Sequence, residues 1–312
     1  MVIGEMAASA AVELAKNEGI QDKTTSLLGM LFPYAGIEKR ALDMYVADIE
    51  KSDLSPESKL IAVLNAKETI KKLKNQHKVA EIAIENANAD TVFDSSSGVN
   101  QEWFERFMDS AGFVSEEQVQ IMWGKVLAKE FDAPGSTPFN MIRILSEITP
   151  QYAQAFQTIC SMKASFIVLD DNGKAMPIRT HTVVPFKENA DEMTALGLSF
   201  AVLNELDTLG LIKFDGSIGF VATNIPDQHV LVFCNGITKE VVKHHGDTIP
   251  IGNVVLTDAG ECLDRITEHA SIEGYENMVK QYLKKSNVVF NDSSEYRIYT
   301  DNDGRLTLHQ RM

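Results

Sequence analysis

The sequence predicts an α+β protein with a mainly helical N-terminal half and a winged-helix-like, mixed α/β C-terminal half. Helical spacing of apolar residues, punctuated by Ser/Thr-Pro starts, dominates the chain as far as Met162. Beyond it, short β-branched runs alternate with turn sequences such as Asp-Asn-Gly, which favours hairpins. A length of 312 residues favours more than one domain. We therefore divide the chain into a helical region at 1–99, a helical core region at 100–163 and a mixed region at 164–312.

The composition is that of an acidic globular protein. Asp and Glu total 44 against 29 Lys and Arg, which gives a formal net charge of −15. A negative field repels phosphate, so nucleic acid is disfavoured as a partner. The first residues lack the pattern of a secretory signal, and no run reaches the roughly 20 apolar residues that a transmembrane helix needs. We expect a cytoplasmic protein in which Leu27–Phe32, the most apolar run, is a core element or, alternatively, a membrane-surface contact.

The strongest helix start is Ser55-Pro56-Glu57, with a capping serine, a proline at the first helical position and an acid at the positive end. The helix should reach about Ala89. Its apolar residues alternate three and four apart, which is a heptad seam. This seam packs within the chain or, alternatively, mediates self-association through Val63–Ala87. The seam residues are Val63, Ala66, Ile70, Leu73, His77, Ala80, Ile84 and Ala87.

The same helix carries a basic run that is a candidate contact for nucleic acid or another anion. Lys71, Lys72 and Lys78 should lie opposite the seam, so a solvated helix face is the alternative. The candidate contact residues are Lys67, Lys71, Lys72, Lys74 and Lys78.

Apolar stripes around the two tryptophans predict the helical core. Trp103 belongs to a helix that ends near Gly112, and Ser115-Glu-Glu-Gln118 has the capping-box spacing that starts the helix of Trp123. Thr149-Pro150 starts another helix. We expect both tryptophans to be buried.

The mixed region contains the sharpest local pattern. After a hairpin at 165–184, a helix is predicted from Asp191 to Leu209, then a second hairpin at 211–221 and a helix capped by Thr257. This order predicts a winged-helix-like unit at about 195–266. Its core should include Leu203, Leu206, Leu209, Leu211 and Ile212.

Winged-helix modules often bind DNA through the helix before the wing. From 195 to 223, however, Lys213 is opposed by Glu205, Asp207 and Asp215, whereas a DNA-binding surface is basic. The predicted hairpin before this helix also leaves it without a helix-turn-helix partner. We therefore expect a structural or protein-binding unit.

No recognisable catalytic, cofactor or metal motif is present. The sequence lacks a P-loop, GxGxxG, HExxH and GxSxG. His244-His245 has no matching ligand spacing, and Asp170–Gly173 and Asp301–Gly304 fail the EF-hand pattern and indicate hairpin turns. We expect no catalytic, cofactor-binding or metal residues and no cofactor. Whether the protein is an enzyme stays open, although the missing motifs weigh against it. The three cysteines, expected to be reduced core thiols, are Cys160, Cys234 and Cys262.

Three segments form an arrangement that recurs in bacterial proteins: Trp103-Phe104, Ser115-Glu-Glu-Gln-Val-Gln-Ile-Met-Trp123-Gly-Lys-Val-Leu-Ala128 and Phe139-Asn-Met-Ile142-Arg-Ile-Leu-Ser-Glu-Ile-Thr-Pro150. With Leu-Thr-x-x-Gly at Leu256–Gly260, they resemble the family called domain of unknown function 2806 and, more distantly, the Abi-alpha family associated with abortive infection. Val126-Leu127 stands where two leucines are usual. These packing and capping positions imply a fold and supply no catalytic residues. The distant resemblance implies a role in defence against phage.

The function predicted is therefore a non-enzymatic bacterial interaction protein whose partner is another protein, with a role in phage defence or stress. The alternative is a nucleic-acid-linked regulator that uses the winged-helix-like unit or the Lys67–Lys78 helix face. An unrecognised hydrolase has no residue in its favour.

Overall fold

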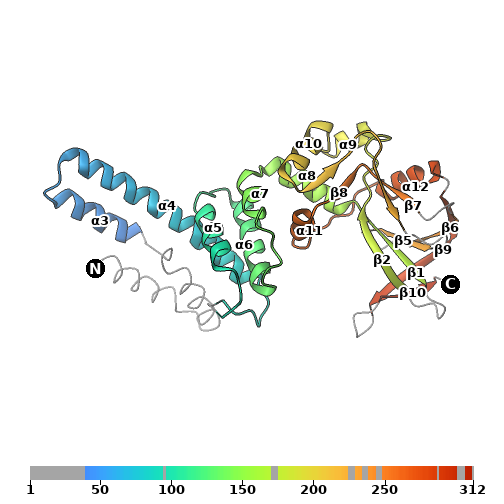
Figure 1. Ribbon diagram of the computed structural model, residues 1–312, viewed down its shortest axis with the longest axis horizontal. Helices are drawn as coiled ribbons and strands as arrows, with labels where there is room; N and C mark the ends of the chain where they lie inside the picture. The colour runs from blue at the N-terminus through green and yellow to red at the C-terminus, as the bar shows by residue number, and fades with distance from the viewer. Residues whose placement is uncertain are drawn as a thin grey trace. The chain divides into compact units, whose positions relative to one another are not determined.

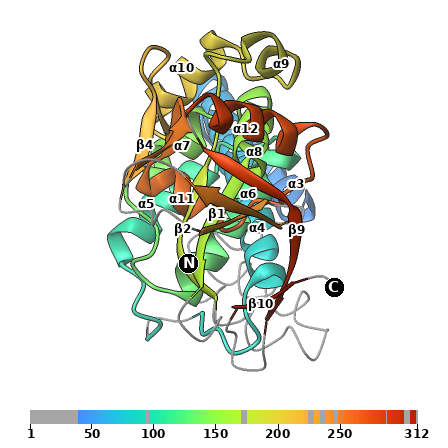
Figure 2. The same ribbon diagram turned by 90° about the vertical axis from the view of Figure 1, so that its right-hand side faces the viewer.

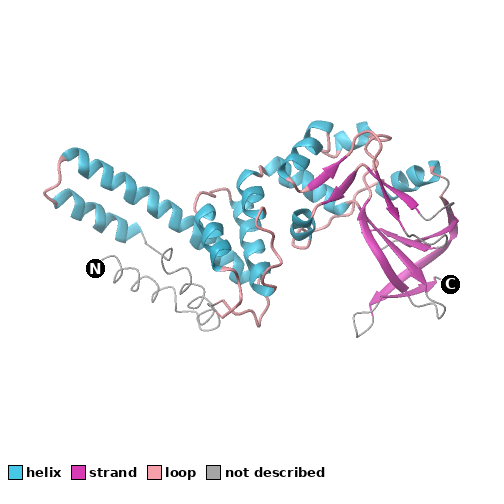
Figure 3. Ribbon diagram, viewed as in Figure 1, coloured by secondary structure: helices cyan, strands magenta, loops and turns pink. Residues whose placement is uncertain are grey.

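The computed structural model describes residues 39–93, 96–169, 175–223, 229–233, 238–243, 248–286, 288–300 and 306–310. The chain forms two compact units, Met1–Ile148 and Thr149–Met312. The described part of the first is helical and that of the second mixes helices with antiparallel strands (Figures 1 and 3), so the expectation of an α+β protein is confirmed. None of the described helices is both long and apolar enough to cross a membrane. Several features singled out in the sequence lie outside the described residues: Leu27–Phe32, Cys234, His244-His245, Asp170–Gly173 and Asp301–Gly304.

The first unit begins, within its described part, with an antiparallel helix pair, α3 and α4 (Figure 1). Ser55 caps α4 as predicted, because its hydroxyl accepts a hydrogen bond from the Ser58 amide at 3.2 Å. The seam faces the rest of the unit, and Ala66, Ile70, Leu73 and Ala80 are buried. The helices of this unit are α3 (Lys39–Lys51), α4 (Pro56–Asn86), α5 (Gln101–Ala111), α6 (Glu117–Asp132) and α7 (Met141–Glu147).

The tryptophans form the centre of the helical core, as predicted. Trp103 and Trp123 are 2% and 0% exposed, and the Phe107 ring lies between them at centroid distances of 4.7 and 4.6 Å. The Trp123 indole N–H donates to the Leu145 carbonyl at 3.3 Å. Gly124 permits the close crossing of α6 and α4, since a Cβ there would collide with the Ile82 side chain.

The prediction that Ser115 caps the helix of Trp123 is wrong, because the helix starts later in the chain. Helix α6 begins at Glu117, and the residue before it, Glu116, makes no side-chain cap hydrogen bond. Side-chain contacts anchor this end of the helix instead. The buried side-chain amide of Gln120, in the first turn, donates to the Val114 carbonyl at 2.8 Å and to Asn75 Oδ1 of α4 at 3.4 Å.

The second unit contains a six-stranded antiparallel sheet with strand order β10-β9-β6-β5-β1-β2. Helix α12 lies beside β9 (Figure 2). The predicted hairpins at both ends of this region are confirmed, as β1 with β2 and β9 with β10. The helices are α8 (Pro150–Ser161), α9 (Ala190–Ala195), α10 (Phe200–Leu209), α11 (Asp258–Asp264) and α12 (Tyr275–Lys285). The sheet strands are β1 (Lys163–Leu169), β2 (Ala175–Thr182), β5 (His229–Phe233), β6 (Thr238–Lys243), β9 (Val289–Thr300) and β10 (Leu306–Gln310).

The predicted hairpin at 211–221 is wrong. Strand β3 (Ile212–Phe214) pairs with β8 (Val254–Leu256), and β4 (Phe220–Thr223) pairs with β7 (Thr248–Gly252). The two pairs form one interrupted ribbon, from which the loop at 215–219 projects. The reason is that the partner of β3 lies about forty residues away in the sequence. Within the intervening loop, the Asp215 carboxylate accepts hydrogen bonds from the Ser217 and Ile218 amides.

The single helix predicted at 191–209 is also wrong, since the chain forms α9 and α10 with a four-residue turn between them. Gly197 has a φ of +82°, which favours glycine, and the Ser199 hydroxyl caps α10 by accepting from the Val202 amide at 3.4 Å. A helix therefore precedes α10, contrary to the expectation that a hairpin would take its place.

The apolar core of this part is as predicted. Thr257 caps α11, and its hydroxyl donates to the Gly210 carbonyl at 2.6 Å, which ties α11 to the end of α10. Gly260 completes the contact, since a Cβ there would collide with the Leu211 carbonyl. The Leu-Thr-x-x-Gly pattern thus allows α11 to pack closely against the end of α10. Leu203, Leu206, Leu209, Leu211 and Ile212 are all buried.

Candidate functional site

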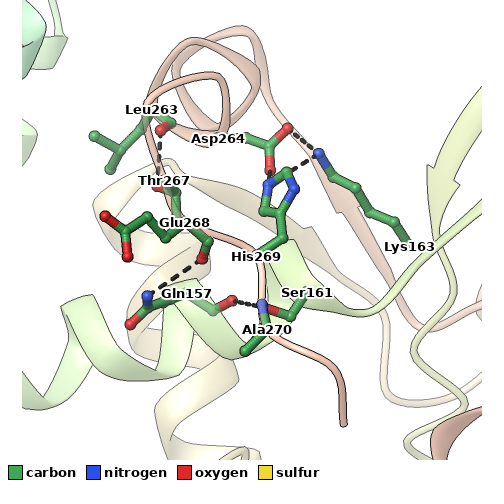
Figure 4. Close-up of polar contacts among 9 residues, drawn as sticks. All are labelled: Gln157, Ser161, Lys163, Leu263, Asp264, Thr267, Glu268, His269 and Ala270. Carbon is green, nitrogen blue, oxygen red and sulfur yellow. Dashed lines mark hydrogen bonds and ion pairs between the residues drawn. The ribbon is translucent and has the colours of Figure 1, made fainter. Parts of the chain in front are cut away.

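In the described part of the second unit, a lysine, an aspartate and a histidine, residue types that enzymes use, lie together (Figure 4). Lys163 begins β1, Asp264 ends α11, and His269 lies in the following loop. The Lys163 ammonium forms an ion pair with Asp264 Oδ2. His269 Nε2 lies 3.0 Å from Asp264 Oδ1 and 3.5 Å from Lys163 Nζ. One carboxylate therefore holds two nitrogen-bearing side chains.

Local structure fixes this cluster. The Ala270 amide donates to the Ser161 hydroxyl at 3.0 Å, and the Gln157 side chain donates to the Glu268 carbonyl at 3.2 Å, so the loop is held against α8 (Figure 4). The side chains of Lys163 and Asp264 are 18% and 12% exposed. The cluster consequently joins the α8–β1 junction to α11 within the second unit.

The neighbouring thiol is not suited to nucleophilic chemistry. Burial, reinforced by the adjacent Asp264 carboxylate, raises the pKa of Cys160 well above its ordinary value of 9.0. The thiol therefore stays protonated at neutral pH, whereas nucleophilic attack and metal binding need the thiolate. Within the part of the chain that the structure describes, no three His, Cys, Asp or Glu residues are arranged to hold a metal ion. We interpret the cluster as an internal clamp.

The basic run predicted on α4 separates into two parts. Four lysines follow one another at intervals of four, three and four residues, so they share one exposed face of the helix. Lys72 is turned away from them, with its ammonium 4.0 Å from the centroid of the Phe113 ring. Lys78 forms an ion pair with Glu81 at 2.9 Å, which raises the pKa of that lysine and reduces the charge at one end of the row. The shared face consists of Lys67, Lys71, Lys74 and Lys78.

Two leucines extend the same helix face toward the N-terminus of α4. Leu60 and Leu64 precede Lys67 at intervals of four and three residues, and their side chains are 61% and 56% exposed. We call the face formed by Leu60, Leu64, Lys67, Lys71 and Lys74 the α4 stripe. It combines an apolar end with a basic end, over about 21 Å at 1.5 Å per helical residue.

Among the residues that the structure describes, the most exposed large apolar side chain lies in the loop between β3 and β4. Ile218 is 91% exposed, and two apolar side chains on the adjoining elements are also exposed: Phe200, the first residue of α10, at 58%, and Val221 in β4 at 56%. We call these three residues the Ile218 surface. Sequence reasoning placed Ile218 in a hairpin strand, and the only available signal was an apolar residue directly after the turn sequence Asp-Gly-Ser.

Hydrogen bonds hold this loop in a defined conformation. Asp215 Oδ1 accepts from the Ser217 amide at 2.8 Å and from the Ile218 amide at 3.0 Å. The Asn253 side chain donates to the Asp215 carbonyl at 2.6 Å, and the Lys187 ammonium donates to the Ser217 carbonyl at 2.9 Å. The backbone hydrogen bonds lower the pKa of Asp215, so its carboxylate remains an acceptor at neutral pH. Ile218 is thus exposed on a loop that hydrogen bonds from Lys187 and Asn253 hold in place.

Aromatic packing supports the loop from beneath. The rings of Phe186, Phe200 and Phe214 are in mutual contact, with centroid distances of 5.4 to 6.3 Å. Gly216 lies against them, since a Cβ there would sit 3.0 Å from the Phe200 ring. Phe200 therefore belongs both to this aromatic cluster and to the exposed surface.

The elements that carry this surface are acidic. Between residues 187 and 223 the sequence has two lysines and six carboxylates, and one of those lysines, Lys213, pairs with Asp207 at 3.2 Å. The exposed carboxylates on α9, α10 and the segment before them include Glu188, Asp191, Glu192 and Glu205. Exposed apolar side chains on net acidic elements are suited to a partner with an apolar contact point and a net basic surface.

Comparison with known proteins gives one family. The model of the family described as "Protein of unknown function (DUF2806)" matches residues 64–280 of the 312. No curated protein and no solved structure matches the chain.

Proposed function

Because the chain belongs to the DUF2806 family, whose description assigns no function, we propose its function from its surfaces: it is a non-enzymatic interaction protein that binds a partner protein through the Ile218 surface. The observation that carries the proposal is the exposure of Ile218, 91%, on a loop held by side-chain and backbone hydrogen bonds. An ordered loop loses little conformational entropy on binding, and a projecting apolar side chain gains most when a partner buries it.

We further propose that α9, α10, the interrupted ribbon and α11 act together as a winged-helix-like unit. The order of these elements and the short turn between α9 and α10 support this. In such a unit α10 would be the helix that contacts DNA. Its exposed side chains are instead uncharged or acidic, which favours a protein partner. They are Phe200, Ala201, Asn204, Glu205 and Thr208.

The proposed setting is bacterial and cytoplasmic. The resemblance of the core helices to the Abi-alpha family supports a partner that belongs to a phage-defence or stress response. The alternative is a nucleic-acid-linked regulator that uses the winged-helix-like unit or the Lys67–Lys78 helix face. The exposed lysines of α4 support it, and a DNA-binding titration tests it separately.

A pull-down with a matched control tests the proposal. The full chain is tagged and used as bait in a bacterial lysate, and each captured protein is then purified and titrated against the bait. Ile218→Asp should weaken the binding of the true partner by about tenfold or more, since a charge replaces the central apolar contact. Val92→Asp makes the same change at a side chain that is 50% exposed in the first unit, and should leave binding intact. Equal binding by both variants would refute the Ile218 surface as the binding site.

A further inference from the structure

We propose that a second copy of this chain is a partner of the Ile218 surface, and that the α4 stripe is the part of that copy which binds. The inference rests on the proposed function, because it uses the same surface, and it adds the identity of the partner. It assigns a role to two exposed features that the core of neither unit uses.

The α4 stripe is available because the opposite face of its helix is occupied. Ala66, Ile70 and Leu73, which belong to the predicted heptad seam, are buried in the first unit, whereas Leu60, Leu64 and the lysines are exposed. Further apolar side chains are exposed beside the stripe, with Ile61 at 59% and Leu54 at 48%. Self-association through α4 therefore has to use this outer face.

The two surfaces are complementary in both polarity and charge. The elements of the Ile218 surface expose apolar side chains and several carboxylates, with Lys187 bound to the loop itself. The α4 stripe exposes two leucines followed by three lysines, with Glu68 exposed beside them. Contact of Ile218 and Phe200 with Leu60 and Leu64 would bury apolar area from both copies. The same alignment brings the lysines toward the acidic α9 and α10, where opposite charges favour association and fix the register.

A second copy accounts for more of the stripe than a polyanion does. Nucleic acid or an anionic lipid headgroup would attract Lys67, Lys71 and Lys74. Phosphate offers no apolar group to the exposed Leu60 and Leu64. The Ile218 surface supplies apolar groups for that end of the stripe, and the elements that carry it supply carboxylates for the basic end.

The contact would join the first unit of one copy to the second unit of another. Such a head-to-tail contact uses different patches on the two copies, so it forms rings or longer chains unless two copies exchange it reciprocally. We therefore expect the mass of the purified protein to rise with concentration.

A charge-swap experiment tests the inference. Sedimentation equilibrium of the full chain measures the mass as the concentration is raised. Lys71→Glu/Lys74→Glu makes the stripe acidic, and Glu192→Lys/Glu205→Lys makes the surroundings of the Ile218 surface basic. Each double variant alone should associate about tenfold or more weakly than the unmodified chain, because like charges then face each other. An equimolar mixture of the two should recover association, since each altered surface meets a partner of opposite charge.

The control is Lys284→Glu/Lys285→Glu, which changes the net charge as much as the stripe variant does, on exposed residues at the end of α12. It should associate as the unmodified chain does. A chain that stays monomeric at every concentration, or a mixture that fails to recover association, would overturn the inference. If the chain does not self-associate but Ile218→Asp abolishes capture of a different protein, the proposed function stands and the self-association proposal fails. If neither self-association nor an Ile218-dependent capture is found, both proposals fail.

Discussion

At the scale of single residues, the Asp264 carboxylate connects two side chains of the second unit. It faces both Lys163 and His269, and its side chain is only 12% exposed. Asp264→Asn would leave the Lys163 ammonium, itself 18% exposed, without its counter-charge. We expect a loss of about 3–5 kcal/mol in the free energy of unfolding, measured by urea titration.

The control for this change is an exposed ion pair. Lys78 and Glu81 are 47% and 46% exposed, so Lys78→Met should change the free energy of unfolding by about 1 kcal/mol or less. A paired replacement, Lys163→Met/Asp264→Leu, should recover part of the loss because no unpaired charge remains. If Asp264→Asn is as mild as the control, the clamp contributes no stability.

Cys160 gives a second residue-scale prediction, this time with a pH dependence. The pKa of its thiol is raised by burial, so the folded thiol should resist alkylation at pH 8 while the urea-unfolded thiol reacts. The folded-state pKa exceeds the ordinary value of 9.0, so only the unfolded thiol ionises as the pH rises above 9. The protonated Cys160 thiol therefore makes its full contribution to the free energy of unfolding below pH 9, and this contribution is lost as the pH rises above 9.

Site-resolved mass spectrometry of a Cys234→Ser variant measures the alkylation, because the remaining thiols, Cys160 and Cys262, are both buried. Comparable labelling of Cys160 in folded and unfolded protein would contradict the prediction. In Cys160→Ala, the free energy of unfolding should depend less on pH above pH 9 than it does in the unmodified chain.

At the scale of elements, Trp123 is the test of the helical core. Its side chain is 0% exposed in α6 and contacts the Phe107 ring. Trp123→Ala should cost about 3–5 kcal/mol, which lowers the melting temperature by many degrees. Phe139→Ala is the control, since Phe139 is 52% exposed. An unchanged melting curve for Trp123→Ala would mean that this side chain does not pack in the core.

The elements that the sequence predicted well are those with local signals. Ser55-Pro56, Thr149-Pro150 and Thr257 each mark a helix start through a side chain that bonds an amide three residues on, and all three are capped as expected. Burial of the leucines of α10 followed in the same way from helical spacing. In these cases the information lies within one turn of the residue concerned.

One wrong prediction depends on a partner that is distant in sequence, whereas the 191–209 helix and the Ser115 capping box failed at positions with local signals. Strand β3 pairs with β8, about forty residues away, and nothing in a single sequence distinguishes that partner from the nearer β4. The break between α9 and α10 was visible as Gly197-Leu-Ser199, but the apolar residues around it kept their helical spacing. The sequence did not predict the Ile218 surface because the exposure of Ile218 follows from the pairing of β3 with the distant β8.

At the scale of the whole molecule, both units are acidic, and charge is distributed unevenly only within each of them. The chain has a net charge of −15, yet three exposed lysines line the α4 stripe in the first unit while the helices that carry the Ile218 surface are acidic. Self-repulsion opposes association over long range, and local complementarity favours it at contact. Salt at roughly 150 mM screens charges beyond about 8 Å, so it weakens the first effect more than the second.

The same distribution predicts how the protein responds to duplex DNA. We expect no appreciable binding at roughly 150 mM salt, because few phosphate contacts are available and binding through them falls steeply as salt rises. The helix best placed to enter a groove, α10, exposes Glu205, which would face phosphate with like charge. A mobility-shift titration measures this. Saturable submicromolar binding would replace the interaction-protein proposal with the nucleic-acid regulator. Loss of that binding in Lys71→Glu/Lys74→Glu would locate the DNA site on α4 and away from the ribbon, provided that the control Lys284→Glu/Lys285→Glu still binds.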